Sequence, residues 1–198
     1  MQVVLLSGGL DSAVCLWLTK GLGKTRAISV DYGQAHRKRE LAAAKAIAAL
    51  ADVEHRVVKA AIPWPPMAGD VLPGRNTILL GIASAHLAAW SGGEGGAVVV
   101  GCCGADAAQF PDCRVEFLLA TQQAVSLGLG TPVHIVAPLV DRTKAQTVAM
   151  GKAAGAWDAM ALSWTCYLGG EVPCGACGSC RSRSAGFAEA GEADPWHA

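Results

Sequence analysis

One short stretch near the N-terminus, residues 3–12, restricts the fold of this chain more than any other feature. It reads Val3-Val4-Leu5-Leu6-Ser7-Gly8-Gly9-Leu10-Asp11-Ser12. Its four apolar residues predict a buried strand. Ser7-Gly8-Gly9 predicts a tight bend. Because these residues lack bulky side chains, their backbone N–H groups can approach a ligand closely. Asp11 and Ser12 then predict the first turn of a helix. A strand, a glycine bend and a helix N-terminus together make a cradle for an anion.

The bend could also be an ordinary strand-to-helix turn, but the Asp11-Ser12 pair that follows it favours a phosphate site. The lysine of the G-x-x-x-x-G-K-[ST] P-loop is absent. The stretch instead resembles the S-G-G-x-D-S pyrophosphate loop of the N-type ATP pyrophosphatases. That resemblance implies a Rossmann-like fold of the adenine nucleotide alpha hydrolase kind. It also implies adenylation of a carboxylate or amide oxygen, with release of AMP and pyrophosphate instead of ADP.

Strand and helix patterns alternate along the rest of the chain. The strands are predicted at 26–30, 54–59, 97–101 and 133–139, and the helices at 37–51, 73–90, 114–127 and 143–154. This alternation predicts an α/β fold with a parallel sheet and helices on both faces. We expect residues 1–160 to form the ATP-binding α/β domain and residues 161–198 a small zinc-binding segment packed on it. The proline-rich segment 60–73 is expected to be a loop, either a stiff connector or a lid over the ligand edge.

The amino-acid composition limits the kinds of partner that the protein is expected to bind. The 16 Lys and Arg residues equal the 16 Asp and Glu residues, so no global basic field attracts nucleic acid, and direct nucleic-acid binding is not expected. We expect no targeting segment, and the sequence contains no apolar run of transmembrane length. We therefore expect a cytoplasmic protein without a membrane partner. The eight cysteines then favour metal or catalytic use over disulfides.

Four of the cysteines form a second strong pattern near the C-terminus. The pattern is Cys166-x7-Cys174-x2-Cys177-x2-Cys180. Four thiolates at this spacing suit a closed tetrahedral Zn²⁺ site. An iron–sulfur cluster is the alternative, although the following C-x3-C-P of ferredoxins is absent. Cys15 fits the apolar core, whereas Cys102, Cys103 and Cys113 could belong either to the core or to a site.

Several polar residues follow predicted strands, where ligands collect in open parallel sheets. They include Asp31 after the second strand, Arg114 after the fourth and Lys144 after the fifth. Each also has a purely structural interpretation: Asp31 as a cap, Arg114 as a surface charge and Lys144 as a solvated residue of a first helical turn. The pattern gains weight because all of them point to the same edge as residues 7–12.

The order of the motifs resembles the 7-cyano-7-deazaguanine synthase family over residues 3–195. Besides residues 7–12 and the four cysteines, the matching motifs are Asp31-Tyr32-Gly33-Gln34-x-His36, Pro73-Gly74-Arg75-Asn76, Phe110-Pro111-Asp112-Cys113-Arg114, Pro138-Leu139 with Thr143-Lys144, Ser163-Trp164-x-Cys166-Tyr167 and Gly186-Phe187-x-x-Ala190-Gly191 with Asp194-Pro195. The resemblance implies that ATP and ammonia turn 7-carboxy-7-deazaguanine into the nitrile through an adenylate and an amide, in queuosine biosynthesis. It also implies a four-cysteine zinc site and a homodimer.

The resemblance and the chemistry together assign roles to individual residues. Asp11, Ser12 and Lys144 are the expected catalytic residues, with Asp11 organising Mg²⁺ or the phosphates. The expected ATP-binding residues are Ser7, Gly8, Gly9, Leu10, Asp11, Ser12, Asp31, Tyr32 and Gln34. The expected substrate-binding residues are His36, Arg75, Asn76, Asp112 and Arg114. Of these, Arg75 or Arg114 could clamp the substrate carboxylate with two hydrogen bonds.

Two positions depart from the family pattern. Ala35 stands where an arginine is usual, and Gln109 stands where a glycine is usual before Pro-Asp-Cys-Arg. Both departures bear on substrate affinity or on the choice of amine. The alternatives are therefore an amide ligase that joins a deazaguanine carboxylate to a protein or nucleic-acid amine, a pyrophosphate-loop tRNA thiolase, and a non-catalytic zinc module that binds a nucleotide or a partner.

Overall fold

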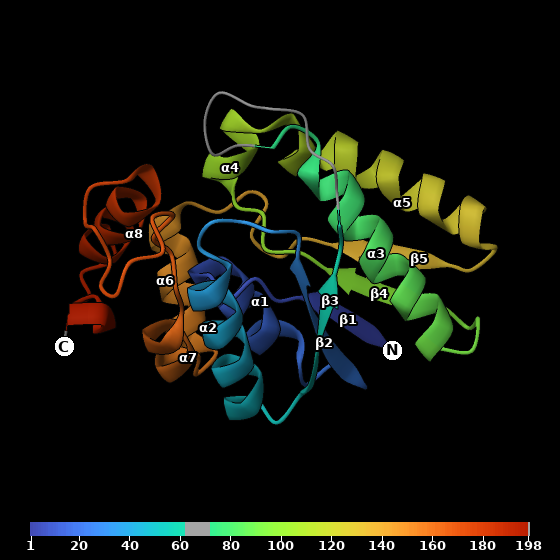
Figure 1. Ribbon diagram of the computed structural model, residues 1–198, viewed down its shortest axis with the longest axis horizontal. Coiled ribbons are helices and arrows are strands. Elements are labelled where there is room, and N and C mark those ends of the chain that lie inside the picture. Colours follow the sequence, from blue (N-terminus) through green and yellow to red (C-terminus); the bar gives the residue numbers. More distant parts are fainter. Residues whose placement is uncertain (62–71, 198) are drawn as a thin grey trace.

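The computed structural model describes residues 1–61 and 72–197 (Figure 1). These residues contain a parallel five-stranded sheet with the order β3-β2-β1-β4-β5. The strands are β1 (Gln2–Leu5), β2 (Thr25–Asp31), β3 (Glu54–Lys59), β4 (Gly96–Val99) and β5 (Val133–Val136). The predicted α/β fold with a parallel sheet is confirmed.

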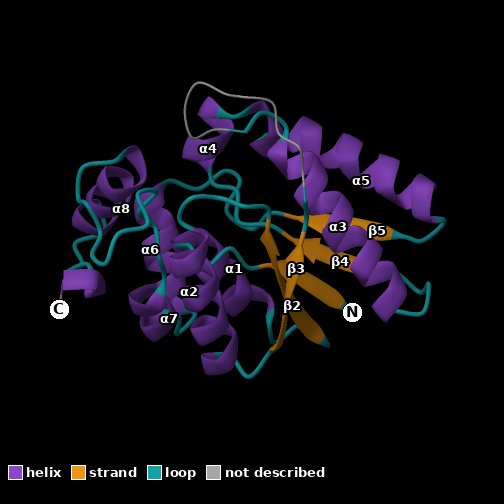
Figure 2. Cartoon of the chain, viewed as in Figure 1, coloured by secondary structure: helices purple, strands orange, loops and turns teal. Residues whose placement is uncertain are grey.

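Helices cover both faces of the sheet (Figure 2). They are α1 (Leu10–Thr19), α2 (Arg37–Leu50), α3 (Arg75–Trp90), α4 (Gly104–Gln109), α5 (Val115–Leu129), α6 (Lys144–Ala153), α7 (Trp157–Leu162) and α8 (Gly178–Glu189), with short 3-10 turns at Pro111–Cys113 and Pro195–His197. One buried cluster lies under α1, α2, α6, α7 and α8. A second lies under α3 and α5. The sheet is thus the middle layer of three.

The alternation of side chains along β1 divides these two cores. Val4 and Leu6 belong to the cluster under α1, and Val3 and Leu5 belong to the cluster under α3. Successive residues of a strand point to opposite faces, so an unbroken apolar run is what a strand buried on both sides requires. Each of these side chains contributes about 1.5–3 kcal/mol when it is fully buried. The N-terminal run therefore anchors the centre of the sheet.

Two strands are shorter than the sequence predicts, and three helices were not predicted. Strand β4 ends at Val99 instead of residue 101, since Gly101 packs against the start of α1: a Cβ atom there would lie 2.9 Å from the Ser12 backbone nitrogen. Strand β5 ends before Pro138, which has no N–H to donate to a neighbouring strand. The unpredicted helices are α4 and α7, which have only six residues each and so carry little periodic signal, and α8, which has few apolar residues and lies in the segment predicted to bind zinc.

Two further expectations from the sequence concern the proline-rich segment and membrane-spanning helices. Most of the proline-rich segment 60–73 lies outside the described residues, so the choice between connector and lid stays a prediction. Within residues 1–61 and 72–197, no helix is both long and apolar enough to span a lipid bilayer.

Candidate functional site

A cavity of about 470 Å³ opens at the carboxyl ends of the strands. Parallel sheets bind ligands at this edge, where the strand order reverses, which here is between β1 and β4. The residues that were predicted from sequence and that line the cavity are Ser7, Gly9, Leu10, Asp11, Ser12, Tyr32, Gln34, His36, Arg75, Asn76 and Lys144. Most of the predicted site residues are therefore brought together, although they come from β1, α1, the loop after β2, α3 and α6.

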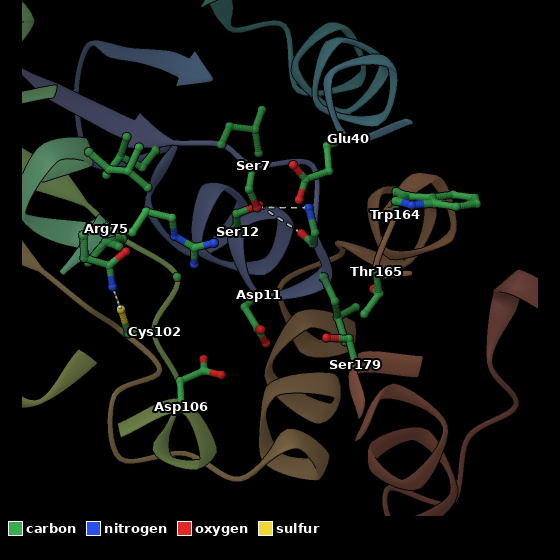
Figure 3. Close-up of a pocket in the computed structure, with 18 of the residues that line it drawn as sticks. Ser7, Asp11, Ser12, Glu40, Arg75, Cys102, Asp106, Trp164, Thr165 and Ser179 are labelled. Carbon is green, nitrogen blue, oxygen red and sulfur yellow. Dashed lines mark hydrogen bonds between the residues drawn. The ribbon is translucent and has the colours of Figure 1, made fainter. Parts of the chain in front are cut away.

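The bend after β1 can be built only with glycine. Gly8 has a φ of +89°, and a Cβ atom added to it would lie 2.3 Å from the Glu40 backbone oxygen. The Ser7 hydroxyl accepts a hydrogen bond from the Gly9 nitrogen at 3.2 Å and lies 3.1 Å from the Ser12 hydroxyl (Figure 3). Gly9 is the N-cap of α1 and has no side chain that could accept from the amides of the first turn. The first amides of α1 are thus available to an anion.

Asp11 and Lys144 form an ion pair beside this bend. The Lys144 Nζ donates to both Asp11 carboxylate oxygens at 2.7 Å, and the two side chains are 21% and 15% exposed for Asp11 and Lys144 respectively. Burial lowers the pKa of Lys144, but the negative charges of Asp11, Cys103 and Asp106 and the hydrogen bond to Asp11 together outweigh burial, so that pKa lies above its ordinary value. The lysine is therefore a permanent positive charge next to the amides of α1. Such a charge suits phosphate oxygens.

Asp106 is a site residue that the sequence reasoning missed. Its carboxylate, the carboxylate of Asp11 and the Cys103 sulfur lie within 4.8 Å of one another. The carboxylates of Asp11 and Asp106 face the same open region (Figure 3). Asp106 is held by its own helix, because it accepts a hydrogen bond from the Cys103 nitrogen at 3.0 Å. An aspartate shortly after a predicted strand was the available signal, and it was overlooked because α4 was not predicted.

Arg75 and Asn76 occupy another part of the cavity, at the start of α3. Arg75 Nη1 donates to the Tyr32 hydroxyl at 3.2 Å. Asp112 holds Asn76 in place, since its Oδ2 accepts from the Asn76 nitrogen at 3.0 Å and its backbone oxygen accepts from Asn76 Nδ2 at 2.9 Å. A guanidinium, an aromatic ring and a buried amide therefore lie together here. This combination suits a planar ligand with a carboxylate.

A polar chain continues this wall towards α2. Gln34 Nε2 donates to Glu40 Oε2 at 3.1 Å, and His36 Nε2 lies 3.2 Å from Glu40 Oε1. The His36 ring also packs against Tyr167, with 5.5 Å between the ring centroids. Glu40 thus fixes both residues that were predicted from the Asp31 motif.

Four predicted residues lie elsewhere, since Gly8, Asp31, Asp112 and Arg114 are not among the described residues that line the cavity. Asp31 Oδ1 accepts from the Gly33 nitrogen at 3.1 Å, which matches its interpretation as a turn cap. Arg114 Nε donates to the Ala107 backbone oxygen at 3.1 Å and so connects α4 with the start of α5. Asp112, as described above, orients Asn76. These residues support the wall without facing the cavity.

The four predicted cysteines converge beside the same cavity. The sulfurs of Cys166, Cys174, Cys177 and Cys180 lie within 4.8 Å of one another. Backbone amides of Ala176 and Cys177 donate to the Cys174 sulfur at 3.4 and 3.3 Å, and these bonds lower the pKa of that thiol to about 6. Four clustered sulfurs with amide donors suit a metal. The donor set fits the predicted site.

The cysteine cluster is continuous with the cavity wall. Cys166 lies between Thr165 and Tyr167, which both line the cavity, and Cys177 is the N-cap of α8. Trp164, Thr165 and Ser179 lie along this wall (Figure 3). The conformation of the cysteine segment, residues 163–197, therefore sets the position of one side of the cavity.

Arg183 is a second residue that the sequence reasoning missed. It is only 1% exposed, and its Nε and Nη2 donate to the Asp194 carboxylate at 2.8 and 2.9 Å. Its Nη1 donates to the Ser163 hydroxyl at 2.6 Å, and Trp196 packs on its guanidinium at 4.0 Å. Burial lowers the pKa of Arg183 and the Asp194 charge opposes this. No sequence pattern separates this buried arginine from the exposed Arg181 two residues earlier.

Comparison with solved structures supports the fold. The chain superposes with a TM-score of 0.54 on a structure titled U34-tRNA thiolase NcsA from Methanococcus maripaludis with its [4Fe-4S] cluster. The two sequences are 16% identical, and the match covers 99% of this chain and 68% of the thiolase. At this identity the likeness extends to the fold alone.

Comparison with characterised families is more specific. Curated relatives named 7-cyano-7-deazaguanine synthase are 39% identical in Laribacter hongkongensis and 40% identical in Chromobacterium violaceum. Both matches cover 98% of this chain, and they cover 92% and 91% of the relatives. Residues 1–63 and 66–191 match the family described as Queuosine biosynthesis protein QueC. The chain therefore belongs to the QueC family.

Proposed function

We propose that this protein converts 7-carboxy-7-deazaguanine and ammonia into 7-cyano-7-deazaguanine, using ATP. The names of the relatives support this reaction. The observation that carries the proposal is that one cavity joins an anion cradle to a polar wall with Arg75, Tyr32 and Asn76. An enzyme that adenylates a carboxylate has to hold the α-phosphate of ATP and the carboxylate of its substrate side by side.

The triphosphate would lie on the cradle. The amides at the start of α1 and the Ser7 and Ser12 hydroxyls are its proposed donors, and Lys144 supplies the charge. Tyr32 and Gln34 remain proposed nucleotide contacts because they line the cavity. Asp31 would act through the turn that it caps.

The chemistry follows from the leaving groups. A carboxylate oxygen of the substrate attacks the α-phosphorus of ATP, and the bond to the bridging oxygen breaks, so that pyrophosphate leaves. Ammonia then attacks the acyl carbon, AMP leaves, and the amide forms as a proton is lost. The amide oxygen can depart only if it is also activated. The amide oxygen attacks the α-phosphorus of a second ATP and pyrophosphate leaves. Loss of AMP and the remaining protons then gives the nitrile.

Mg²⁺ is the proposed metal at the phosphate end. Asp11 and Asp106 offer carboxylate oxygens from two different helices, and carboxylates are the ligands that Mg²⁺ prefers. Burial raises the pKa of Asp11 beyond what the Lys144 charge offsets, so a cation beside its carboxylate would be favoured. When bound, Mg²⁺ would neutralise the departing pyrophosphate.

The substrate carboxylate is assigned to Arg75 rather than Arg114. Arg75 lines the cavity, whereas Arg114 is bonded to the Ala107 backbone oxygen. His36 and Asn76 are further proposed substrate contacts, and Asp112 would orient Asn76. The guanidinium can present two parallel donors to the carboxylate before it is activated.

Zn²⁺ is the proposed metal at the cysteine cluster. Four sulfurs without an open position suit a structural zinc, with no part in the reaction steps. An iron–sulfur cluster would instead give a coloured protein with labile sulfide. Metal analysis of the purified protein separates the two.

A homodimer is also proposed. Val115, Leu119 and Leu127 of α5 are 47%, 58% and 75% exposed, and such apolar residues on one helix suit a contact with a second copy. We further place the reaction in the cytoplasm, because a reducing compartment keeps metal-binding thiols reduced.

The reaction is tested with purified protein, ATP, Mg²⁺, ammonia and 7-carboxy-7-deazaguanine, followed by mass spectrometry. We expect the nitrile and AMP. ADP as the main product would contradict the adenylation chemistry. A reaction that stops at the amide, or that consumes ATP only when an amine-bearing macromolecule is added, would replace nitrile synthesis with the amide ligase.

A further inference from the structure

Two thiols in the cavity have no part in the proposed chemistry. Cys102 follows β4 and Cys113 ends the 3-10 turn before α5, so α4 lies between them in the chain. They are 3% and 7% exposed, and both line the cavity. Each thiol is the largest influence on the pKa of the other, so the two side chains lie close together. Asn76 Nδ2 donates to both sulfurs, at 3.8 Å to Cys102 and 3.3 Å to Cys113 (Figure 3 draws the bond to Cys102).

The other buried cysteines of this region are occupied differently. Cys15 Sγ donates to the Val100 backbone oxygen at 3.8 Å, and Cys103 lies 3.5 Å from Lys144 Nζ. Among the described residues, the groupings of three or more metal-ligating side chains include neither Cys102 nor Cys113. The pair is therefore a pair of facing free thiols and not part of a recognisable metal site.

We propose that Cys102 and Cys113 form a reversible disulfide in the wall of the cavity, and that this disulfide inhibits the enzyme. The linkage follows from the position of the two sulfurs, which both contact Asn76 Nδ2 in the wall of the cavity. Its effect on turnover rests on the proposed function, because it places the oxidised bond beside the residues assigned to the substrate.

A peroxide supplies the oxidising equivalents. The Cys113 sulfur attacks one peroxide oxygen, the O–O bond breaks, and a sulfenic acid forms as hydroxide leaves. The Cys102 sulfur then attacks the Cys113 sulfur, the S–S bond forms, and water leaves with the thiol proton. In total, two thiols and one hydrogen peroxide give a disulfide and two waters. The hydrogen bonds from Cys102 and Asn76 lower the pKa of Cys113, which suits it to be the attacking thiol.

The disulfide would disturb the start of α3. Its sulfurs have to approach to about 2.05 Å, and they then no longer offer the two thiol acceptors that Asn76 Nδ2 contacts. Asn76 adjoins Arg75, the proposed clamp of the substrate carboxylate. We therefore expect oxidation to lower kcat/KM by about tenfold or more, since a displaced binding group costs on this scale.

The linkage is tested by treating the reduced, metal-loaded full chain with hydrogen peroxide, alkylating free thiols and digesting without reductant. A protease that cuts before Asp106 and Asp112 separates residues 70–105 from residues 112–140. We expect these two fragments to be joined, with a mass two hydrogens below their sum. Cys102→Val should abolish the joined species, and Cys113→Ser should do the same. The matched control Cys103→Ala, which changes the adjacent thiol, should keep it.

Absence of the joined fragments in the oxidised wild type would overturn the proposal, as would their persistence in Cys102→Val. Circular dichroism of each variant shows that the comparison is between folded proteins. In the wild type, kcat/KM should fall in proportion to the joined fraction and return with dithiothreitol. Fully joined protein with the rate of the reduced protein would overturn the inhibition. The fragment masses need no turnover, so a failure of the proposed reaction would be recognised separately.

Discussion

Two walls of the same cavity are built by different means. The loop at residues 7–12 is fixed by backbone geometry: Gly8 sits where a Cβ atom would lie 2.3 Å from a backbone oxygen, and Gly101 leaves room for Ser12. The cysteine segment, residues 163–197, is fixed by side chains, namely four clustered sulfurs and the buried Arg183–Asp194 pair. One wall is thus determined by close packing of the backbone, whereas the other depends on interactions between side chains.

This difference predicts whether a substitution in each wall first lowers catalysis or first lowers stability. Changes in the loop should remove catalysis and leave the fold intact, because the strand and helix around it have their own apolar cores. Changes in the cysteine segment should lower stability first. Its Arg183–Asp194 pair is buried, and a buried polar group that loses its partner bears the full cost of desolvation.

The largest effect is expected for Arg183→Met. The substitution leaves the Asp194 carboxylate, whose side chain is 9% exposed, without its partner. Removal of one member of a buried ion pair costs about 3–5 kcal/mol. We expect a loss of this size in the free energy of unfolding, measured by urea denaturation.

The double variant Arg183→Met/Asp194→Leu is the matched control. It removes both charges and should recover part of the loss, since no charge is then left unpaired. Arg142→Met, which affects an arginine 44% exposed and paired with Asp141, should change stability little. Equal effects of the Arg183 and Arg142 changes would show that the buried pair does not hold the cysteine segment.

The second-largest effect is expected for Asp11→Asn. The amide keeps the size of the side chain but loses the charge that pairs with Lys144 at 2.7 Å and faces Asp106. Turnover should fall by at least about a hundredfold, the scale on which a positioned electrostatic group contributes. The measurement is steady-state release of AMP.

Asp158→Asn in the first turn of α7 serves as the control, because it makes the same change on an exposed surface. The melting temperature of Asp11→Asn should stay close to that of the wild type. A wild-type rate in Asp11→Asn would place the site elsewhere, and a large loss of stability would remove the contrast between the two walls.

Substitution of a cysteine in the metal site is expected to have an intermediate effect on stability. Cys177→Ser removes one of four sulfurs, while the serine hydroxyl can still cap α8 in place of the sulfur that accepts from the Cys180 nitrogen at 3.4 Å. Metal binding is coupled to folding of its ligands, so the melting temperature should fall, by about 4–8 °C for a loss of about 2 kcal/mol. Metal content should drop from about one zinc per chain, and Cys15→Ser is the control thiol. Full zinc content in Cys177→Ser would contradict this ligand set.

The two walls also differ in how far the sequence predicts them. The strand, bend and helix of residues 3–12 follow from local pattern, as do the four cysteines, because glycine, apolar runs and cysteine spacing each have few physical uses. Asp106 and Arg183 could not be predicted in this way. Asp106 acts through its distance from Asp11, and Arg183 through burial against Asp194, and neither relation leaves a periodic signal.

The two departures from the family pattern, Gln109 and Ala35, are expected to affect substrate binding to different extents. Gln109 ends α4 and lines the cavity. Gln109→Ala removes its amide without adding the backbone freedom of glycine, and we expect the KM for 7-carboxy-7-deazaguanine to rise about 2–10-fold, as for one hydrogen bond. Gln123→Ala on the exposed face of α5 is the control. An unchanged KM would mean that Gln109 does not contact the substrate.

The smallest effect is expected for Ala35→Arg, which restores the arginine usual in the family at the junction of the two walls. Ala35 is exposed and is not among the described residues that line the cavity. Its backbone oxygen lies near the cysteine segment, since a Cβ atom on Gly169 would be 3.4 Å from that oxygen. An exposed substitution of this kind changes free energies by about 0.5 kcal/mol or less, so KM should stay within about twofold. Ala35→Gln, which adds a long side chain without charge, is measured beside it. If the arginine variant alone lowers KM by more than about fivefold, the new guanidinium reaches the substrate and the cavity extends past His36 to the surface of α2.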